Sequence, residues 1–410
     1  MEFFKVLSLE EMKKLFLSLS FQSRIEEVEL SQSCFRVLAE DVVATHNWPL
    51  AHRSSMDGYA LRAQDTFGAS ENNPVYLKLK GELKIDERPN IELQRGECIG
   101  VVTGGLIPKG ADSVLMVEYT ERLGNTLEVK KSVYPQENII LAGEDFGQGE
   151  KVLSQGKRIG FKEIGAMASL GLAKIKVYAK PRVGIISTGD ELIEVNKMPS
   201  LGQVRDVNSY TLRALLAREH IEGKIYPLVK DDKNQLTDRI NLALQENDVV
   251  LLSGGSSVGT RDLTLEVLQE MKDAQVLLHG LGLSPGKPTL LVKIGEKFVF
   301  GLPGQVTSAQ IVFMIVVAPF LRIWEREENV FQNLWPCKVK AVLSRNIASV
   351  SGRFHLVRVK LEQKEDQYVA TPILGKSGLL KPLFLADGLL PIAENLEGIS
   401  AGALVEVWKF

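Results

Sequence analysis

The residues best suited to chemistry lie in one short stretch, Asp248–Thr264, which reads DVVLLSGGSSVGTRDLT. Its first part, Asp248–Leu252, is a β-branched apolar run typical of a buried parallel strand, and a helical pattern begins near Leu263. The glycine- and serine-rich turn between them would place free backbone N–H groups at the positive end of a helix, where phosphate binds. The turn matches neither G-x-G-x-x-G nor a P-loop, so it predicts an anion site without a nucleotide fingerprint. The alternative is a tight loop that only turns the chain.

Asp262 follows this turn and indicates a metal ion. A carboxylate about 4 Å from a phosphate charge is repelled by about 4 kcal/mol at an effective dielectric constant of about 20. A cation between them would remove that repulsion, and Mg²⁺ is the usual cation beside phosphates. The alternative is that Asp262 only caps the next helix. Gly255–Gly259 also matches the Gly-x-Ser-x-Gly elbow of serine hydrolases, but Ser257 lies several residues from both strand and helix, which argues against a catalytic triad.

Acidic residues follow three successive predicted strands. Glu191 comes shortly after Val183–Ser187, and Asp231 comes shortly after Ile225–Val229. The third strand leads through the glycines to Asp262. Because ligands of open α/β sheets bind outside the carboxyl ends of the strands, this pattern predicts a cation-assisted phosphate or pyrophosphate site. The alternative is that these loop acids only cap helices.

Two Pro-Gly turns, Ser284–Pro288 and Gly301–Gly304, bracket the last predicted strands. If those strands join the same sheet, Lys287 could supply positive charge for a second anion. A solvated loop lysine is the alternative. The N-terminal turns Ser54–Ala60 and Gly143–Asp145 also contain acids, and from their residue types alone they are better interpreted as structural turns.

Composition excludes several classes of protein. The chain has 410 residues with 49 basic and 51 acidic side chains, and no segment is densely basic, so we expect no nucleic-acid partner. Three cysteines without CxxC spacing argue against disulfides and zinc and favour a reducing cytoplasm. Gly301–Leu321 carries no charge, but its dense apolar part, Ile311–Leu321, is too short to span a bilayer. We therefore expect a core helix and no membrane partner.

The rhythm of short segments predicts a multidomain α/β plus β protein with a central parallel α/β sheet. The predicted domains are a helical linker region (1–45 and 143–180), a β-rich insert (46–142), a central α/β domain (181–326) and a C-terminal β domain (327–410). Within the linker region, Ile25–Leu30 and Phe35–Val43 read as short helical pieces. The C-terminal alternation fits a small β-barrel or a sandwich.

Several motifs occur in a fixed order along the whole chain. They are Met56–Ala60, Thr103–Gly105 with Pro108 and Gly110–Asp112, Gly143–Asp145, Ser187–Leu192, Ser253–Gly255 with Ser257–Gly259 and Asp262, Pro285–Pro288, and Gly301–Gly304. With these motifs the chain resembles the bacterial molybdopterin molybdenumtransferases, the MoeA family, which is related to the E domain of gephyrin. The resemblance implies four domains, including an α/β domain of the molybdopterin-binding type, in agreement with the segmentation above.

The resemblance also implies an activity. Members of the family convert adenylylated molybdopterin and molybdate, with Mg²⁺, into molybdenum cofactor and AMP. It implies a cytoplasmic homodimer in which the insert of one subunit helps to close the crevice of the other. It further makes a molybdopterin adenylyltransferase a candidate partner.

Roles for individual residues follow from the same resemblance. A phosphate of the adenylylated pterin would be cradled by Gly254, Gly255, Ser256, Ser257 and Gly259, and Mg²⁺ would be held, or water oriented, by Asp262, Glu191 and Asp231. Positions important for activity are matched by Asp57, Thr103 and Asp145. Molybdate would be contacted by Lys287 and Ser308, with Pro303 in the same binding region.

Departures from the family pattern leave two alternatives open. The family commonly reads Leu-Pro-Gly-Asn-Pro-Val-Ser, whereas Val306 here replaces the second proline. The lysines that often precede the Pro-Gly-Lys-Pro turn are here Gly280 and Ser284. Both changes fall where molybdate should bind. The alternatives are a non-catalytic relative that binds pterin or a protein partner, and a tungstate-inserting version of the same enzyme.

Overall fold

The computed structural model describes residues 6–254, 263–335 and 337–410. The chain forms two compact units, one containing the residues up to Glu26 together with Tyr178–Phe410, and the other containing Glu27–Val177. Each unit is described by itself below. The division into four domains stays a prediction.

The first unit is built around a six-stranded sheet with the order β16-β13-β17-β21-β20-β18. Its strands are β13 (Val183–Ser187), β16 (Gly223–Ile225), β17 (Val249–Ser253), β18 (Ala274–His279), β20 (Leu290–Ile294) and β21 (Lys297–Leu302). Strands β16, β13, β17 and β21 are parallel, whereas β20 is antiparallel to both of its neighbours. The predicted α/β sheet is confirmed, with one antiparallel strand added to its parallel core.

One predicted strand is shorter than expected. The strand predicted at Ile225–Val229 ends at Ile225, and Val229 forms only an isolated bridge with Thr188. Pro227 lies between them, and a proline has no N–H group to donate to a neighbouring strand. The predicted strand therefore breaks at the proline, although its far end still reaches the same edge of the sheet.

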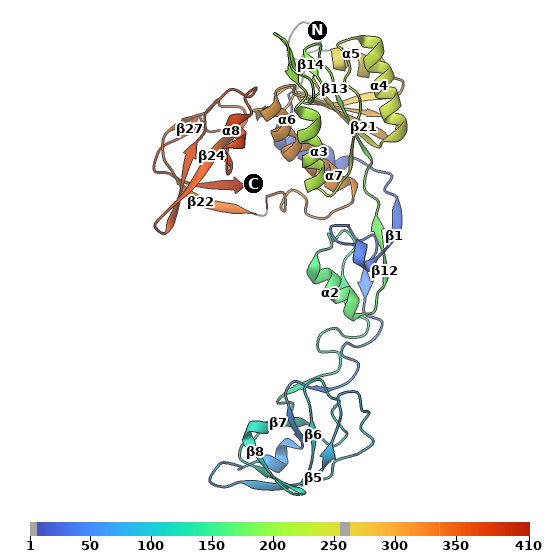
Figure 1. Ribbon diagram of the computed structural model, residues 1–410, viewed down its shortest axis with the longest axis vertical. Helices are drawn as coiled ribbons and strands as arrows, with labels where there is room; N and C mark the ends of the chain where they lie inside the picture. Colours follow the sequence, from blue (N-terminus) through green and yellow to red (C-terminus); the bar gives the residue numbers. More distant parts are fainter. Residues whose placement is uncertain (1–5, 255–262, 336) are drawn as a thin grey trace. The chain divides into compact units, whose positions relative to one another are not determined.

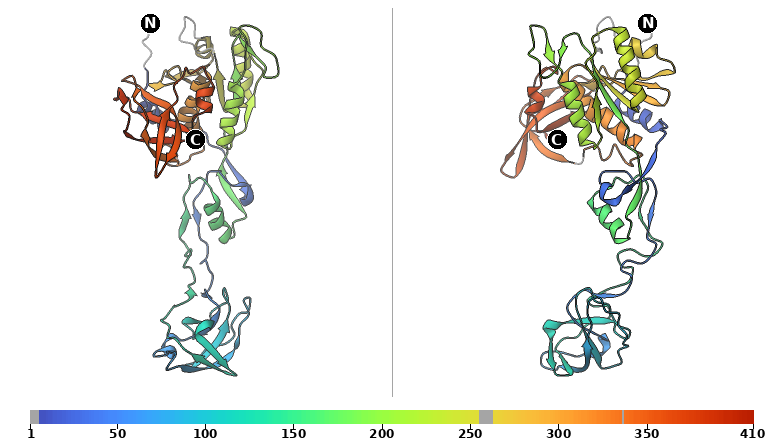
Figure 2. Two further views of the ribbon diagram at one scale, coloured as in Figure 1. Left: turned by 60° about the vertical axis from the view of Figure 1, so that its left-hand side comes forward. Right: turned by 45° about the vertical axis from the view of Figure 1, so that its right-hand side comes forward.

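Helices cover both faces of this sheet (Figures 1 and 2). One face carries α1 (Leu9–Ser18), α3 (Asn208–Arg218), α6 (Val306–Val312) and α7 (Ala318–Trp324), and the other carries α4 (Lys233–Glu246) and α5 (Leu263–Gln269). Val249 and Leu251 pack in the first layer, whereas Val250 and Leu252 pack in the second. Successive side chains of a strand point to opposite faces, so a strand covered on both sides is apolar throughout.

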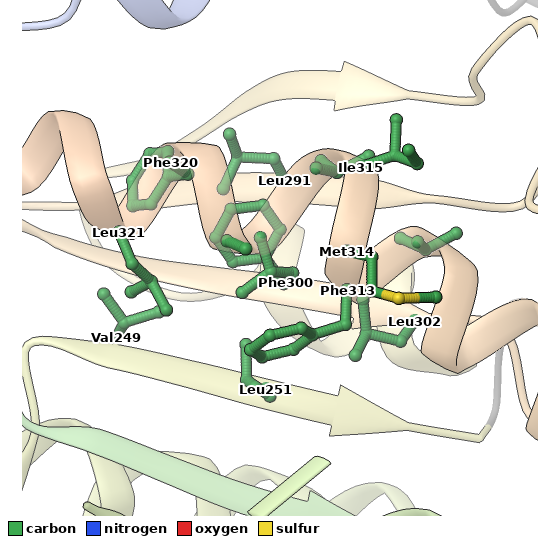
Figure 3. Packing of buried hydrophobic residues seen from close by; sticks show 14 of the residues in the cluster. Val249, Leu251, Leu291, Phe300, Leu302, Phe313, Met314, Ile315, Phe320 and Leu321 are labelled. Atoms are coloured by element: carbon green, nitrogen blue, oxygen red, sulfur yellow. The ribbon is translucent and has the colours of Figure 1, made fainter. Parts of the chain in front are cut away.

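The long apolar segment is the central helix of the core. Val306–Trp324 is long and apolar enough to cross a membrane by composition, with a mean hydropathy of 1.9, but 83% of it is buried inside the protein. A π-helical segment, Phe313–Val317, joins α6 to α7. Figure 3 shows Phe313 and Leu321 packed towards Leu251 and Val249 of β17. The predicted core helix is confirmed.

The N-terminal segment contains two corrections. The helical interpretation of Ile25–Leu30 is wrong, because Ile25–Glu29 is a strand, β1, which pairs with β12 (Lys174–Tyr178). The partner strand lies far away in the sequence, so the local pattern does not reveal it. The helical interpretation of Phe35–Val43 is also wrong, because this piece has isolated β-bridges and ends in a short strand. Helix α1 belongs to the first unit, where Met12 and Phe16 are buried and Phe16 packs edge-on against Phe320 at 5.3 Å between ring centroids.

The second unit contains the predicted β-rich insert. Its main sheet has the order β7-β4-β6-β5-β9-β8, formed by β4 (Gly58–Leu61), β5 (Val75–Glu82), β6 (Glu97–Val101), β7 (Ser113–Met116), β8 (Thr120–Leu123) and β9 (Thr126–Val129). Two short pairs, β2 (Val42–Val43) with β11 (Lys151–Leu153) and β3 (Arg53–Ser54) with β10 (Ile139–Ile140), and helix α2 (Phe161–Ser169) complete the unit. The β-rich character predicted for the insert is confirmed.

The C-terminal region of the first unit is a closed five-stranded barrel (Figure 2). Its strands are β22 (Lys338–Leu343), β24 (Phe354–Lys364), β25 (Gln367–Pro372), β26 (Gly388–Ile392) and β28 (Leu404–Lys409), and pairing of β24 with β26 closes it. The remaining short elements are β14 (Leu192–Ile193) paired with β15 (Val204–Arg205), β19 (Leu283–Ser284) paired with β24, β23 (Ile347–Ala348) paired with β27 (Gly398–Ile399), and helix α8 (Lys381–Phe384). Of the two alternatives, the barrel is correct.

Candidate active site

The carboxyl ends of three parallel strands meet at one edge of the α/β sheet. Thr188 follows β13, Gly254 follows β17, and Pro303 follows β21. The backbone N–H of Thr188 donates to the carbonyl oxygen of Ser253 at 2.9 Å, which ties the first two ends together. Gly254 has a φ of +105°, and a Cβ there would lie 2.0 Å from the carbonyl oxygen of Thr188. The turn therefore requires glycine at this position.

A cavity of about 1110 Å³ opens at these strand ends. It brings together these predicted site residues: Glu191, Asp231, Gly254, Lys287, Pro303 and Ser308. Its wall also includes residues of the C-terminal region, namely Arg353, Ser377, Gly378 and Leu380. This volume is large enough for a nucleotide-linked ligand. The cavity lies where ligands of open α/β sheets bind.

Two carboxylates are held at the edge of this cavity. The hydroxyl of Thr188 donates to Oδ1 of Asp231 at 2.9 Å. The side chain of Glu191 folds back over Gly189. A Cβ placed on that glycine would lie only 2.8 Å from Oε2 of Glu191. Both acids are exposed and both line the cavity. The cavity wall therefore carries these two carboxylates on neighbouring loops.

Glu191 and Asp231 have the donor chemistry of magnesium ligands, because Mg²⁺ binds carboxylate oxygens. Within residues 6–254, 263–335 and 337–410, no cluster of three or more His, Cys, Asp or Glu side chains is arranged around a common point. Mg²⁺ is usually held by one or two carboxylates together with water and substrate phosphates, so two carboxylates suffice. The third predicted ligand, Asp262, lies outside the described residues.

The cavity lining contains three cationic residues, Arg205, Lys287 and Arg353, and the Nε of Arg205 donates to the carbonyl oxygen of Lys197 at 3.0 Å. Lys287 is exposed in the turn after Pro285, where its carbonyl oxygen accepts from the N–H groups of Leu281 and Thr289, both at 2.9 Å. Arg353 reaches the same cavity because β19 pairs in parallel with β24, which places Ser284 opposite His355. The departure at Ser284 therefore lies near an arginine that sequence reasoning missed.

Ser308 lies at the start of α6, on the cavity wall, with 4% of its surface exposed. The preceding residue, Thr307, binds the loop that contains Ser377. Its N–H donates to the carbonyl oxygen of Ser377 at 3.1 Å, and its hydroxyl donates to that of Leu379 at 2.9 Å. The barrel loop is thereby fixed against the first turn of α6.

Asp57 and Thr103 form a contact within the second unit. The N–H and the hydroxyl of Thr103 both donate to Oδ1 of Asp57, at 2.6 and 2.9 Å. These two hydrogen bonds, the backbone one first, hold the pKa of Asp57 below its ordinary value, because they stabilise the charged carboxylate. Sequence reasoning named both residues separately, but only the structure shows that they are paired.

Thr103→Val is expected to raise the pKa of Asp57 part of the way towards its ordinary value. Valine removes the hydroxyl donor and keeps the stronger contribution, the backbone N–H. Because the pKa is lower in the folded protein, the two bonds add stability above the unfolded pKa, and this stability is lost as the pH falls through the folded pKa. An NMR titration of the Asp57 carboxyl carbon measures the shift. Thr120→Val, which removes a hydroxyl bonded to Val117, is the control.

Asp145 is the remaining predicted site residue within the described part of the chain. Asp145 is exposed in the second unit, and its N–H donates to the carbonyl oxygen of Trp48 at 3.2 Å. The remaining predicted residues, Gly255, Ser256, Ser257, Gly259 and Asp262, lie outside the described residues.

Comparison with known families covers most of the chain. Residues 7–171 match the MoeA N-terminal region (domain I and II), residues 184–323 match a family described as a "Probable molybdopterin binding domain", and residues 340–410 match the MoeA C-terminal region (domain IV).

Individual proteins are similar over nearly the whole length. The chain is 37% identical to a protein of Methanocaldococcus jannaschii named provisionally as a molybdopterin biosynthesis protein, covering 97% of this chain and 95% of that one. It is 30% identical to the molybdopterin molybdenumtransferase of Staphylococcus aureus (strain COL), covering 93% and 90%. A crystal structure of the molybdopterin biosynthesis MoeA protein from Pyrococcus horikoshii has a TM-score of 0.83 at 32% identity, covering 99% of this chain and 100% of that one.

The cavity, the glycine turn after β17 and the closed C-terminal barrel lie within regions that these family matches cover. The identity to the Staphylococcus aureus enzyme extends over both units of the structure. The chain therefore belongs to the MoeA family and is a transferase of molybdenum cofactor biosynthesis.

Proposed function

We propose that this protein inserts molybdate into adenylylated molybdopterin in a Mg²⁺-dependent reaction that releases AMP. The observation that carries the proposal is the cavity at the sheet edge, because its lining combines a glycine turn, three acidic residues and three cationic residues. An adenylylated pterin carries a phosphoanhydride, and molybdate is a second anion. A cavity for both needs one subsite for phosphate and one for the oxyanion.

The phosphate subsite lies at the turn after β17. Gly254 begins the predicted cradle, which continues through Gly255, Ser256, Ser257 and Gly259. Backbone N–H groups aimed at a phosphate stabilise the charge that develops on it when AMP leaves. Glu191, Asp231 and Asp262 would hold Mg²⁺, which when bound neutralises negative charge on the phosphoanhydride. Thr188 orients Asp231 for this role through its hydroxyl hydrogen bond.

The oxyanion subsite lies between the Pro-Gly-Lys-Pro turn and the barrel loop. Lys287 and Arg353 supply positive charge, and Ser308 and Ser377 are hydroxyl residues on the same wall. Arginine binds tetrahedral oxyanions well because its guanidinium group offers several donors in a fixed plane. Arg353 thus replaces charge that the chain lacks at Gly280 and Ser284.

The change from proline to Val306 is compatible with this subsite. Val306 is the first residue of α6, directly after the N-cap Gln305. Proline is favoured at that position because its missing N–H costs no helical hydrogen bond, so valine there leaves the helix start intact. The position of Arg353 in the cavity and the intact helix start at Val306 support the catalytic function over a non-catalytic relative.

The test is to incubate the protein with adenylylated molybdopterin, Mg²⁺ and molybdate, and to follow AMP release and cofactor formation. The expected result is AMP release that needs both Mg²⁺ and an oxyanion. Tungstate in place of molybdate, and the two in competition, decide which oxyanion is preferred. Pterin binding without AMP release would instead identify a non-catalytic relative.

Arg353→Gln is expected to raise KM for molybdate about tenfold while the affinity for AMP stays within twofold. Loss of a hydrogen bond to a charged group costs about 1.5–3 kcal/mol, and a factor of ten corresponds to about 1.4 kcal/mol. Lys376→Gln is the matched control, because Lys376 is an exposed cation beside Ser377 that does not line the cavity. If both variants raised KM for molybdate equally, the effect would come from the loss of a nearby positive charge and not from a contact between Arg353 and molybdate.

Further parts of the proposal concern the assembly. We infer a cytoplasmic homodimer, with a molybdopterin adenylyltransferase as a partner that supplies the substrate. The family membership supports the dimer, and three free cysteines support a reducing compartment. Asp57, Thr103 and Asp145 would act at the crevice of the partner subunit. Sedimentation of the wild-type protein measures the oligomeric state.

A further inference from the structure

Asn208 is a buried polar residue on the wall of the cavity and was not predicted to belong to the site. It is the first residue of α3, and 8% of its surface is exposed. It lies where the chain enters α3 after β15, beside the ends of two central strands.

The side-chain amide of Asn208 bridges the turns that follow β17 and β21. Its Nδ2 donates to Oγ of Ser253 at 2.6 Å and to the carbonyl oxygen of Gly304 at 2.9 Å. A carbonyl oxygen can only accept, so the contact with Gly304 fixes which side-chain atom is the nitrogen. The two turns also touch directly, since a Cβ on Gly304 would lie 3.5 Å from Cα of Gly254.

The other side-chain atom of Asn208, Oδ1, is buried and has no hydrogen-bond donor within the described ranges 6–254, 263–335 and 337–410. Among the described residues, the oxygen end of the side chain therefore makes no hydrogen bond, whereas the nitrogen end makes two. Because Oδ1 has almost no accessible surface, it does not reach into the cavity. The useful part of the side chain is therefore the two-donor amide nitrogen.

We propose that Asn208 is a positioning residue that holds the Ser253–Gly254 turn and the Pro303–Gly304 turn in one fixed relation. The first turn begins the proposed phosphate subsite, and the second leads into α6 and Ser308 of the proposed oxyanion subsite. The nitrogen of Asn208 thus sets the spacing of the two subsites. The catalytic consequence of this inference rests on the proposed function, whereas the structural part does not.

The first test compares Asn208→Ala with a matched control, Asn247→Ala. Asn247 is also buried, at 3% exposure, and its Nδ2 also makes two hydrogen bonds, to the Tyr226 hydroxyl and the Ala243 carbonyl oxygen, both at 2.8 Å. Asn247 does not line the cavity. Amide hydrogen exchange in the full-length protein is expected to rise at least tenfold in peptides covering the two turns in Asn208→Ala and to stay unchanged there in Asn247→Ala. Unchanged exchange in the turns of Asn208→Ala would overturn the proposal, whether or not the protein is active.

The second test separates positioning from folding. Asn208→Asp keeps the shape of the side chain but loses both donors, so it is expected to lower kcat for AMP release at least tenfold, as Asn208→Ala does, with KM for each substrate within about threefold. Asn247→Ala is expected to keep kcat within twofold. Wild-type kcat in Asn208→Asp would overturn the proposal. An inactive wild-type protein would instead contradict the proposed function, and the exchange experiment would still decide the role of Asn208.

Discussion

Gly254→Ala is expected to reduce AMP release at least a hundredfold and to lower the free energy of unfolding by about 2–5 kcal/mol. The new Cβ would lie 2.0 Å from the carbonyl oxygen of Thr188, and the φ of +105° is one that residues other than glycine rarely adopt. Left-handed strain costs about 1–2 kcal/mol and overpacking about 1–3 kcal/mol, which together give the expected range. Because Thr188 is itself bound to Ser253, the clash can be relieved only by moving the turn that begins the phosphate subsite. Urea unfolding and AMP release at a temperature where the variant is folded measure the two effects.

Gly202→Ala is the matched control for this variant. Gly202 has a φ of +87°, but a Cβ there would have no heavy atom within 4 Å. It should therefore lose about 1–2 kcal/mol from backbone strain alone and keep its activity. If folded Gly254→Ala released AMP at the wild-type rate, the turn after β17 would not be the phosphate subsite. If both variants lost the same stability, the clash with Thr188 would be too weak to matter.

The α/β sheet could be predicted because its signals are local. Val249–Ser253 is buried on both faces and apolar except at its end, and Val183–Ser187 was predicted with the same bounds that the structure has. The acids at Glu191 and Asp231 were placed at one edge by topology alone, since parallel strands end on the same side. The error in the strand predicted at Ile225–Val229 also has a local cause. The strand ends before Pro227, which has no N–H group to donate to a neighbouring strand.

The parts that could not be predicted depend on contacts between distant segments. Arg353 reaches the cavity only because β24 pairs with β19, and no residue type near Arg353 indicates that pairing. The helical interpretation of Ile25–Leu30 failed for the same reason, since its partner strand β12 is supplied by the chain beyond the insert. Asn208 carries no motif of its own, and its role becomes visible only when the ends of β17 and β21 are seen together. Local sequence patterns thus predict helices and strands. Contacts between side chains that are distant in the sequence become visible only in the folded structure.

Asp231→Asn is expected to lower kcat/KM for AMP release about a hundredfold and to raise the Mg²⁺ concentration needed for half-maximal activity. The substitution keeps the shape of the side chain, and the amide oxygen can still accept from the hydroxyl of Thr188. It removes one negative charge from the cavity edge, and Mg²⁺ sites beside phosphates depend on one or two carboxylates. The stability should stay within about 0.5 kcal/mol, because Asp231 is exposed. Activity is measured against Mg²⁺ concentration, and Mg²⁺ binding by calorimetry in the presence of AMP.

Asp232→Asn tests whether this effect belongs to the site or only to the net charge. Asp232 is the next residue and loses the same charge, but its side chain accepts from the N–H of Gln235 as the N-cap of α4 and does not line the cavity. Asparagine caps helices about as well as aspartate, so stability and Mg²⁺ dependence should both stay close to wild type. Equal losses in the two variants would mean that the field of the loop acids, and not a contact of Asp231 with the metal–phosphate group, supports the reaction. A loss confined to Asp231→Asn would place the divalent ion at the carboxyl end of the sheet, between the acid that Thr188 orients and the turn that Gly254 begins.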